Sequence, residues 1–374
     1  MERLKTAGKY VLNFVLILAI GALSLFLSVG DEGEGFIDAL VSSDKRFLVV
    51  MACLMLGYYL IDALILFIIC KTLNYRIGYK QSFVTNMTGV LFSDLTPSST
   101  GGQFAQVYVF HNQGVPAGIG SGILAMCFVT HQIVIIIYAT VAMLCNYQTI
   151  FSNQQTTVIA IVGFIVNVVI TGSFFLATKL KKFHTFLTVS CLKFLEKIHL
   201  VKDYDKTSNT VNKSFEEFRN VSNILFSRKS LFFKVCLCHA LKLTLLYSVP
   251  FFAALALKVP LTAANYPNFL SLAAAISLFN TFMPIPGASG GSEASFMLLF
   301  GFLGQATASS AMLIWRTFTF YFGLLISVFI VAFAKDTKGG IMKGIKEMEK
   351  AQDKELSGAS TESEKEAGSD GDGK

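Results

Sequence analysis

Two short polar stretches in an otherwise apolar chain contain residue types that could hold a charged group. The first, TPSSTGGQFAQ, covers Thr96 to Gln106, and the second, PGASGGSEASF, covers Pro286 to Phe296. Each places a proline ahead of hydroxyl side chains and a Gly-Gly pair. Proline ends a helix, and paired glycines permit a tight turn with close backbone approach. The repetition of this order indicates a duplicated device that stops one helix and starts another.

The helix that starts at each Gly-Gly pair would supply the chemistry, and we predict that Gln103 and Ser292 begin these helices. Its first N–H groups have no partner within the helix, and its positive dipole end favours an anion such as phosphate. The alternative is that both stretches are structural turns whose hydroxyls only cap the helices. The predicted lipid-binding residues of the two stretches are Pro97, Ser98, Ser99, Thr100, Gly101, Gly102, Gln103, Gln106, Pro286, Gly287, Ser289, Gly290, Gly291, Ser292 and Glu293.

Charged residues near these stretches extend the predicted site. Asp94 lies just before the first proline, and we predict that it lines the same cavity. Arg316 lies inside an apolar run, where a charge is costly and therefore indicates function. Its guanidinium could pair with Glu293 or bind a phosphate through two parallel hydrogen bonds. The alternative is that Arg316 extends its charge toward the membrane surface.

Four further ionisable residues lie within apolar runs. Asp62 has no obvious partner nearby in the sequence, and Lys242 is expected to snorkel because it lies about one turn inside its run. His131 and His239 are expected to be interior histidines with satisfied hydrogen bonds. We find no Ser-His-Asp order, metal-ligand spacing, phosphate-binding loop or dinucleotide fingerprint. We therefore assign no catalytic residue, no metal and no cofactor.

The composition predicts an all-α polytopic membrane protein. The 374 residues are 53% hydrophobic and only 15% charged, whereas soluble domains are about one quarter charged. Apolar runs of about 20 residues recur, and each is long enough to cross the bilayer as a helix. The predicted spans are 10–29, 47–70, 118–144, 157–178, 235–257 and 307–334.

The distribution of Lys and Arg among the loops places both termini in the cytoplasm, with the chain in the cell membrane. The loops alternate consistently between the two sides of the membrane only if two segments do not cross it. These segments, 81–112 and 268–304, contain the two stretches and must return to the side from which they enter. The arm from Ser82 to Leu95 would make about 21 Å of helix, too short for a bilayer of about 30 Å. We therefore predict about six full spans plus two re-entrant helical hairpins in an inverted repeat, an arrangement that places substrate near the membrane midplane.

Three regions follow from this reading. Residues 1–335 form the transmembrane domain, and the basic segment 179–234 within it is predicted to form two amphipathic helices on the inner membrane surface. Residues 336–374 are rich in Ser, Gly, Glu and Lys and are predicted to be a disordered cytoplasmic tail.

Residues of both stretches and of the last span resemble those of a known family, the lysylphosphatidylglycerol synthase transmembrane region, which is the flippase-like domain of multiple peptide resistance factors. The resemblance covers roughly residues 8–335. In the last span the first tyrosine of the family pattern LWR-x-x-TYY is replaced by phenylalanine. The residues that match the three patterns are Thr96, Pro97, Gly101, Gly102, Gln103, Gln106, Pro284, Pro286, Gly287, Ala288, Ser289, Gly290, Gly291, Glu293, Ile314, Trp315, Arg316, Thr319, Phe320 and Tyr321.

The resemblance implies a domain that moves an anionic or aminoacylated phospholipid, such as lysylphosphatidylglycerol, between leaflets. In full-length members a separate cytoplasmic domain makes that lipid from lysyl-tRNA and phosphatidylglycerol. We expect that domain to be missing, so the expected partners are membrane phospholipids and no nucleic acid. Two alternatives stay open: phosphatidylglycerol lysyltransferase activity, alone or with a separate lipid-modifying enzyme, and a membrane scaffold for a synthase. Association with a second copy of the chain is also open.

Overall fold

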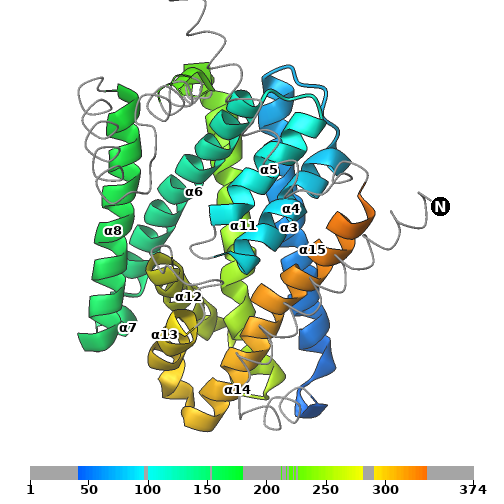
Figure 1. The fold of residues 1–374 in the computed structure, drawn as a ribbon. Coiled ribbons are helices and arrows are strands. Elements are labelled where there is room, and N and C mark those ends of the chain that lie inside the picture. The colour runs from blue at the N-terminus through cyan, green and yellow to red at the C-terminus, as the bar shows by residue number, and fades with distance from the viewer. Residues whose placement is uncertain are drawn as a thin grey trace, which may run out of the picture.

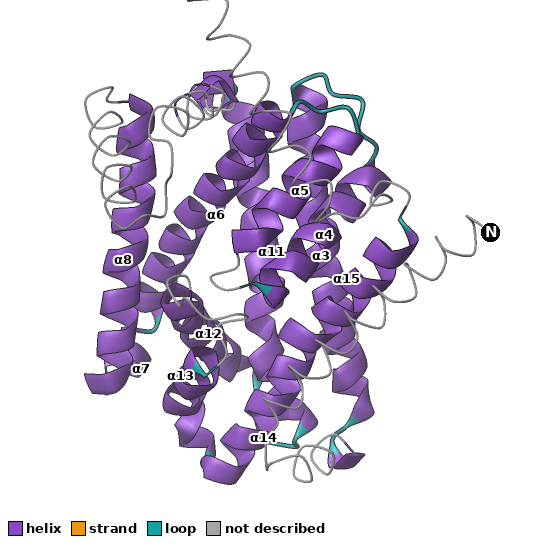
Figure 2. Cartoon of the chain, viewed as in Figure 1, coloured by secondary structure: helices purple, strands orange, loops and turns teal. Residues whose placement is uncertain are grey.

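The computed structural model describes residues 41–96, 100–151, 154–179, 226–280 and 290–334, together with a few positions between 212 and 224. Every regular element in these ranges is a helix (Figure 2). The predicted first span, most of the basic segment and the predicted tail lie outside the described residues. The α-helices are α3 (Lys45–Thr72), α4 (Tyr79–Leu95), α5 (Thr100–Asn112), α6 (Ala117–Cys145), α7 (Tyr147–Phe151), α8 (Gln154–Lys179), α11 (Lys229–Ala256), α12 (Tyr266–Asn280), α13 (Gly291–Phe300), α14 (Gln305–Arg316) and α15 (Phe322–Phe333).

Four helical segments are long and apolar enough to cross a membrane: Lys45–Thr72, Ala117–Cys145, Lys229–Ala256 and Gln305–Phe333. They correspond to four of the six predicted spans, and α8 covers a fifth. The fifth predicted span, 235–257, corresponds to α11, which begins at Lys229 and ends at Ala256. Both Lys229 and Lys234 are exposed, so the helix extends beyond its apolar run by keeping these charges outside the core.

The long helices alternate in direction (Figure 1). The C-terminal ends of α3 and α8 lie at the same end of the bundle as the N-terminal ends of α6 and α11. The main scaffold is the extensive contact between α3 and α11, which is extended at one end by a hydrogen bond from Asp44 N to Ala256 O at 2.9 Å. Asp44 also caps α3, because its carboxylate accepts a hydrogen bond from Arg46 N at 3.0 Å.

Two helical hairpins enter this bundle from opposite ends (Figure 1). Helices α4 and α5 pack closely against each other, and so do α12 and α13. In Figure 1 α4 descends from the upper end and α5 returns to it, whereas α12 rises from the lower end and α13 returns there. The ends of α4 and α12 and the starts of α5 and α13 therefore lie toward the middle of the bundle.

The last long segment contains a widened turn. A 3₁₀ turn, η5 (Gly301–Leu303), links α13 to α14, and a π-helical turn, η6 (Thr317–Tyr321), joins α14 to α15. Beyond this turn Leu324, Val328 and Val331 pack into a core cluster with residues of α4 and α5. The uninterrupted span predicted over 307–334 is thus a helix whose two halves are offset by a π turn immediately after Arg316.

Candidate functional site

A cavity of about 630 Å³ lies inside the bundle, between the ends of the two hairpins. Helices α3, α6 and α11 supply much of its wall, and α4, α5, α12, α14 and η6 supply the rest. Its polar and charged lining residues are Tyr58, Tyr59, Asp62, Asn86, Ser93, Asp94, Gln103, Gln106, Cys127, His131, Gln132, His239, Lys242, Tyr247, Ser277, Asn280, Arg316 and Thr319.

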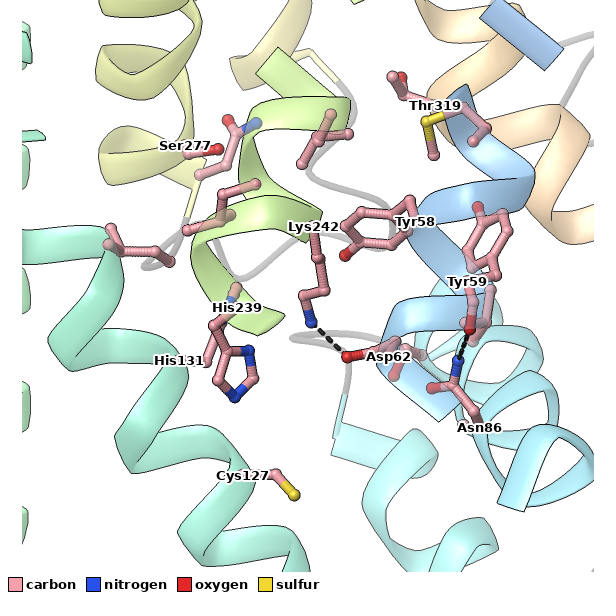
Figure 3. A pocket seen from close by; sticks show the side chains of 18 of the residues that line it. Tyr58, Tyr59, Asp62, Asn86, Cys127, His131, His239, Lys242, Ser277 and Thr319 are labelled. Carbon is pink, nitrogen blue, oxygen red and sulfur yellow. Dashed lines mark hydrogen bonds and ion pairs between the residues drawn. The ribbon is translucent and has the colours of Figure 1, made fainter. Parts of the chain in front are cut away.

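Lys242 of α11 and Asp62 of α3 both line the cavity and form an ion pair with each other (Figure 3). The Lys242 side chain is only 6% exposed, and its Nζ lies 5.2 Å from the centre of the Tyr58 ring. The prediction that Lys242 snorkels is therefore wrong: close packing of α3 against α11 gives the ammonium a carboxylate partner inside the protein. Sequence reasoning could not pair the two residues, because they lie 180 positions apart.

Two histidines lie beside this ion pair. The ring centroids of His131 on α6 and His239 on α11 are 5.2 Å apart, and Figure 3 shows both rings near Lys242 and Asp62. The Nδ1 atoms of both rings are buried and have no hydrogen-bond partner among the described residues. The expectation of satisfied interior histidines is wrong for these nitrogens, since each ring borders the cavity instead of a second polar side chain.

The first predicted stretch places two of its residues on the cavity, beside the neighbouring Asp94. Asp94, near the end of α4, and Gln103 and Gln106, in the first two turns of α5, all line it. Helix α5 begins at Thr100, so it starts three residues before the predicted Gln103. Pro97, Ser98, Ser99 and the Thr100 side chain lie outside the described residues.

The Gly-Gly pair of this stretch serves close packing. A Cβ atom on Gly102 would lie 2.0 Å from Ser93 Oγ and 2.6 Å from the Gly89 carbonyl oxygen, so only glycine fits between α4 and α5 here. Thr96 closes the bend, because its hydroxyl donates to Phe92 O at 2.6 Å and accepts from Gly101 N at 2.9 Å. Gly101 and Gly102 are helical, so the expected tight turn lies before them, whereas the expected close approach is present.

The second predicted stretch reaches the cavity through Arg316. Arg316 lines the cavity and its Nε donates to Glu293 Oε1, in the first turn of α13, at 2.6 Å. This confirms the predicted pairing of the two residues and excludes snorkelling of Arg316, which is buried. Ser292 donates to the other Glu293 oxygen at 3.2 Å. Gly290, Gly291, Ser292 and Glu293 are not themselves among the lining residues, and Pro286, Gly287 and Ser289 lie outside the described ranges.

Gly290 has the backbone conformation that the second stretch predicts. Its φ of +82° lies in the region that favours glycine, and it precedes the first residue of α13, Gly291. The helix thus begins one residue before the predicted Ser292. Gly290 therefore has the conformation of a turn, whereas Gly101 and Gly102 of the first stretch are helical.

The arrangement suits a ligand that carries charge. Asp62 and Asp94 offer carboxylates, Lys242 and Arg316 offer cations, and the Arg316 guanidinium also faces the Phe320 ring at 4.9 Å. In the described part of the chain no group of three or more His, Cys, Asp or Glu residues could hold a metal ion. A charged group within an apolar bundle is costly unless paired, and here both ion pairs border one cavity.

The site residues that sequence reasoning did not select are Asp62, Lys242, His131 and His239. The available signal was their ionisable character inside apolar runs, which is a functional indication by itself. Taken alone, Lys242 is explained by snorkelling and each histidine by an interior position, whereas Asp62 has no partner nearby in the sequence. Only the packing of α3, α6 and α11 brings all four to one wall of the cavity.

Comparison with known proteins agrees with the motif analysis. The chain matches the family described as "Lysylphosphatidylglycerol synthase TM region" over residues 12–327, which include every described helix that lines the cavity. No curated protein matches the chain.

Proposed function

We propose that this chain, which belongs to the lysylphosphatidylglycerol synthase TM region family, moves an anionic or aminoacylated phospholipid between the leaflets of the cell membrane. The observation that carries the proposal is the charged cavity between the two hairpins. A headgroup crossing a bilayer must exchange water for other polar partners, because the hydrocarbon core offers none. The cavity offers such partners inside the membrane domain.

The hairpins give the proposal its geometry. Because neither α4 nor α5 is long enough to cross about 30 Å of hydrocarbon at about 1.5 Å per residue, we infer that they form a re-entrant hairpin. Helices α12 and α13, at 15 and 10 residues, are short for the same reason. Entry from opposite ends would bring both tips to the midplane, as in inverted-repeat transporters.

The phosphate would lie between Arg316 and the first turn of α5. Arg316 presents a planar donor that suits phosphate, and Gln103 and Gln106 add side-chain amides at the start of α5. Asp94 and Asp62 would face an ammonium group where the headgroup carries one. In this arrangement the predicted residues of the second stretch act through Glu293, which positions Arg316.

Reconstituted protein tests the proposal. Liposomes containing fluorescent phosphatidylglycerol, or its lysyl derivative, should expose inner-leaflet label to an external quencher when the protein is present. Empty liposomes and liposomes with heat-denatured protein set the background rate. Failure to move either lipid above this background would reject the proposal.

Equilibrium binding offers a second readout. Trp315 is the single tryptophan of the chain, it lines the cavity and it stacks on Phe296 with ring centroids 5.1 Å apart. Short-chain phosphatidylglycerol should therefore change its emission in a saturable way, while an uncharged short-chain diacylglycerol should not. Because the fluorophore is unique, the signal reports on this cavity without labelling.

Aminoacyl transfer remains the rival, because the matched family description contains the word synthase. Purified protein supplied with charged lysyl-tRNA and phosphatidylglycerol distinguishes the two. Under the transport proposal no lysylphosphatidylglycerol forms, and product formation by this chain would favour the enzyme.

A further inference from the structure

One wall of the cavity holds a proton-accepting group that the phosphate site does not use. His239 is 1% exposed, and its Nε2 lies 3.1 Å from Thr130 Oγ1. The Thr130 hydroxyl has one proton, and its nearest carbonyl acceptor is Met126 O at 2.8 Å. With that proton committed, Thr130 Oγ1 accepts, and on this hydrogen-bond pattern we assign the ring proton to His239 Nε2.

This assignment leaves a free base at the cavity. In neutral imidazole only one nitrogen carries a proton, so Nδ1 of His239 has a lone pair. It is buried and has no hydrogen-bond partner among the described residues. His131 lies with its ring centroid 5.2 Å away, and its Nδ1 is also buried and unpartnered there. Both residues line the cavity, so water within it could deliver a proton to either ring.

Proton uptake by a histidine would change the net charge of this part of the cavity wall. Asp62 and Lys242 form an ion pair whose formal charges cancel, so the wall around neutral histidines has no net charge. One added proton makes this wall cationic. The other titratable groups that line the cavity are Tyr58, Tyr59 and Asp62 on α3, Asp94 on α4, Cys127 on α6, Lys242 and Tyr247 on α11, and Arg316 on α14.

We propose that the His131–His239 pair is a proton-loading site, and that a proton enters and leaves the cavity together with an anionic headgroup. Hydronium in the cavity transfers a proton to the Nδ1 lone pair: one O–H bond breaks and leaves water, and an N–H bond forms to give an imidazolium. The cation then attracts the phosphate, and loss of the proton to water on the other side releases it. Charged and histidine side chains within membrane domains perform this kind of relay in pumps and transporters. The inference rests on the proposed lipid transport and adds what drives it.

Binding and protonation must then be coupled in both directions. If protonation strengthens lipid binding, lipid binding must strengthen protonation by the same factor. The Trp315 titration with short-chain phosphatidylglycerol should therefore give tighter binding as pH falls through the range in which the histidines gain a proton. The same binding, measured by calorimetry in buffers of different ionisation enthalpy, should show net proton uptake by the wild-type protein.

A matched pair of variants assigns the effect. His239→Gln keeps an N–H donor within reach of Thr130 but removes the titratable nitrogen, whereas His111→Gln changes an exposed histidine at the end of α5. We expect the affinity of His239→Gln to depend less on pH than that of the wild type, with a correspondingly smaller proton uptake, because His131 stays titratable. We expect His111→Gln to behave as the wild type.

Transport separates this inference from the function on which it rests. With a pH gradient across proteoliposomes, we expect wild-type lipid movement to accelerate toward the alkaline side and an entrapped pH dye to report proton entry. Lipid movement that ignores the gradient, or binding without proton uptake in wild-type protein, overturns the proton inference while transport stands. Absence of any lipid movement removes both. The calorimetric test uses the wild-type protein alone, so its outcome does not depend on whether His239→Gln folds.

Discussion

Arg316 Nε donates to Glu293 Oε1 at 2.6 Å, and this contact connects the first turn of α13 to the cavity wall. It joins the polar stretch of the second hairpin to the last long segment of the chain. This contact uses one of the five N–H groups of the guanidinium. In the proposed lipid site the same guanidinium would contact both Glu293 and a phosphate.

The first prediction concerns Arg316→Lys. Lysine keeps the charge but lacks both the Nε donor and the planar fork, so it cannot hold Glu293 and phosphate together. We expect a loss of about 1.5–3 kcal/mol in lipid binding, the range for hydrogen bonds to charged groups. The measurement is the Trp315 emission titration with short-chain phosphatidylglycerol. Arg76→Lys, at an exposed position between α3 and α4, is the control and should bind normally.

The second prediction concerns the pair of Asp62 and Lys242. Lys242→Met leaves a carboxylate without its cation and should destabilise the protein by about 3–5 kcal/mol, as breaking one side of a buried pair does. The double variant Asp62→Leu/Lys242→Met should recover most of this loss in thermal unfolding in detergent. It should still fail to move lipid. Normal transport by the stable double variant would show that the pair is only structural.

The third prediction concerns the contact between α4 and α5. Gly102→Ala would place a methyl group 2.0 Å from Ser93 Oγ and 2.6 Å from Gly89 O, and the backbone carbonyl cannot rotate away. We expect a destabilisation of about 1–3 kcal/mol, typical of overpacking, together with slower lipid movement. Gly172→Ala in α8, where nothing lies within 4 Å, is the matched control. Equal unfolding midpoints for the two variants would contradict the prediction.

The fourth prediction separates backbone conformation from space. Gly290 and Gly301 both have nothing within 4 Å of an added Cβ, but their φ values are +82° and −58°. Gly290→Ala should therefore cost about 1–2 kcal/mol through its left-handed backbone alone, and Gly301→Ala should cost nothing comparable. Thermal unfolding of both variants, measured side by side, checks this difference.

Local sequence signals predicted much of the fold because they depend on neighbouring residues. The long apolar runs located α3, α6, α8 and α11 to within a few residues, and the proline and glycine pattern located the breaks within both hairpins. Gly290 has the predicted turn conformation. The π turn after Arg316 had no such signal, since the apolar run continues through it without a proline or glycine.

The cavity itself could be predicted only in part. Gln103 and Gln106 belong to the first stretch, Asp94 lies beside it, and Arg316 is a charge inside an apolar run; the sequence predicted all four, and all four line the cavity. The pairing of Asp62 with Lys242 depends on the register between α3 and α11, which local sequence does not encode. For the same reason each histidine looked like an isolated interior residue until α6 and α11 brought their rings to 5.2 Å.

The π turn at Thr317–Tyr321 makes the orientation of α15 depend on the number of residues in the turn. Before the turn Arg316 faces the cavity, and after it Leu324 and Val328 pack against the α4–α5 hairpin. Removing one residue from the turn would restore a regular helix but rotate everything beyond it by about 100°. Either the guanidinium or the two aliphatic side chains would then face the wrong neighbour. The one extra residue of the π turn thus sets the rotation of α15 relative to α14. This rotation lets Arg316 face the cavity while Leu324 and Val328 pack against the first hairpin.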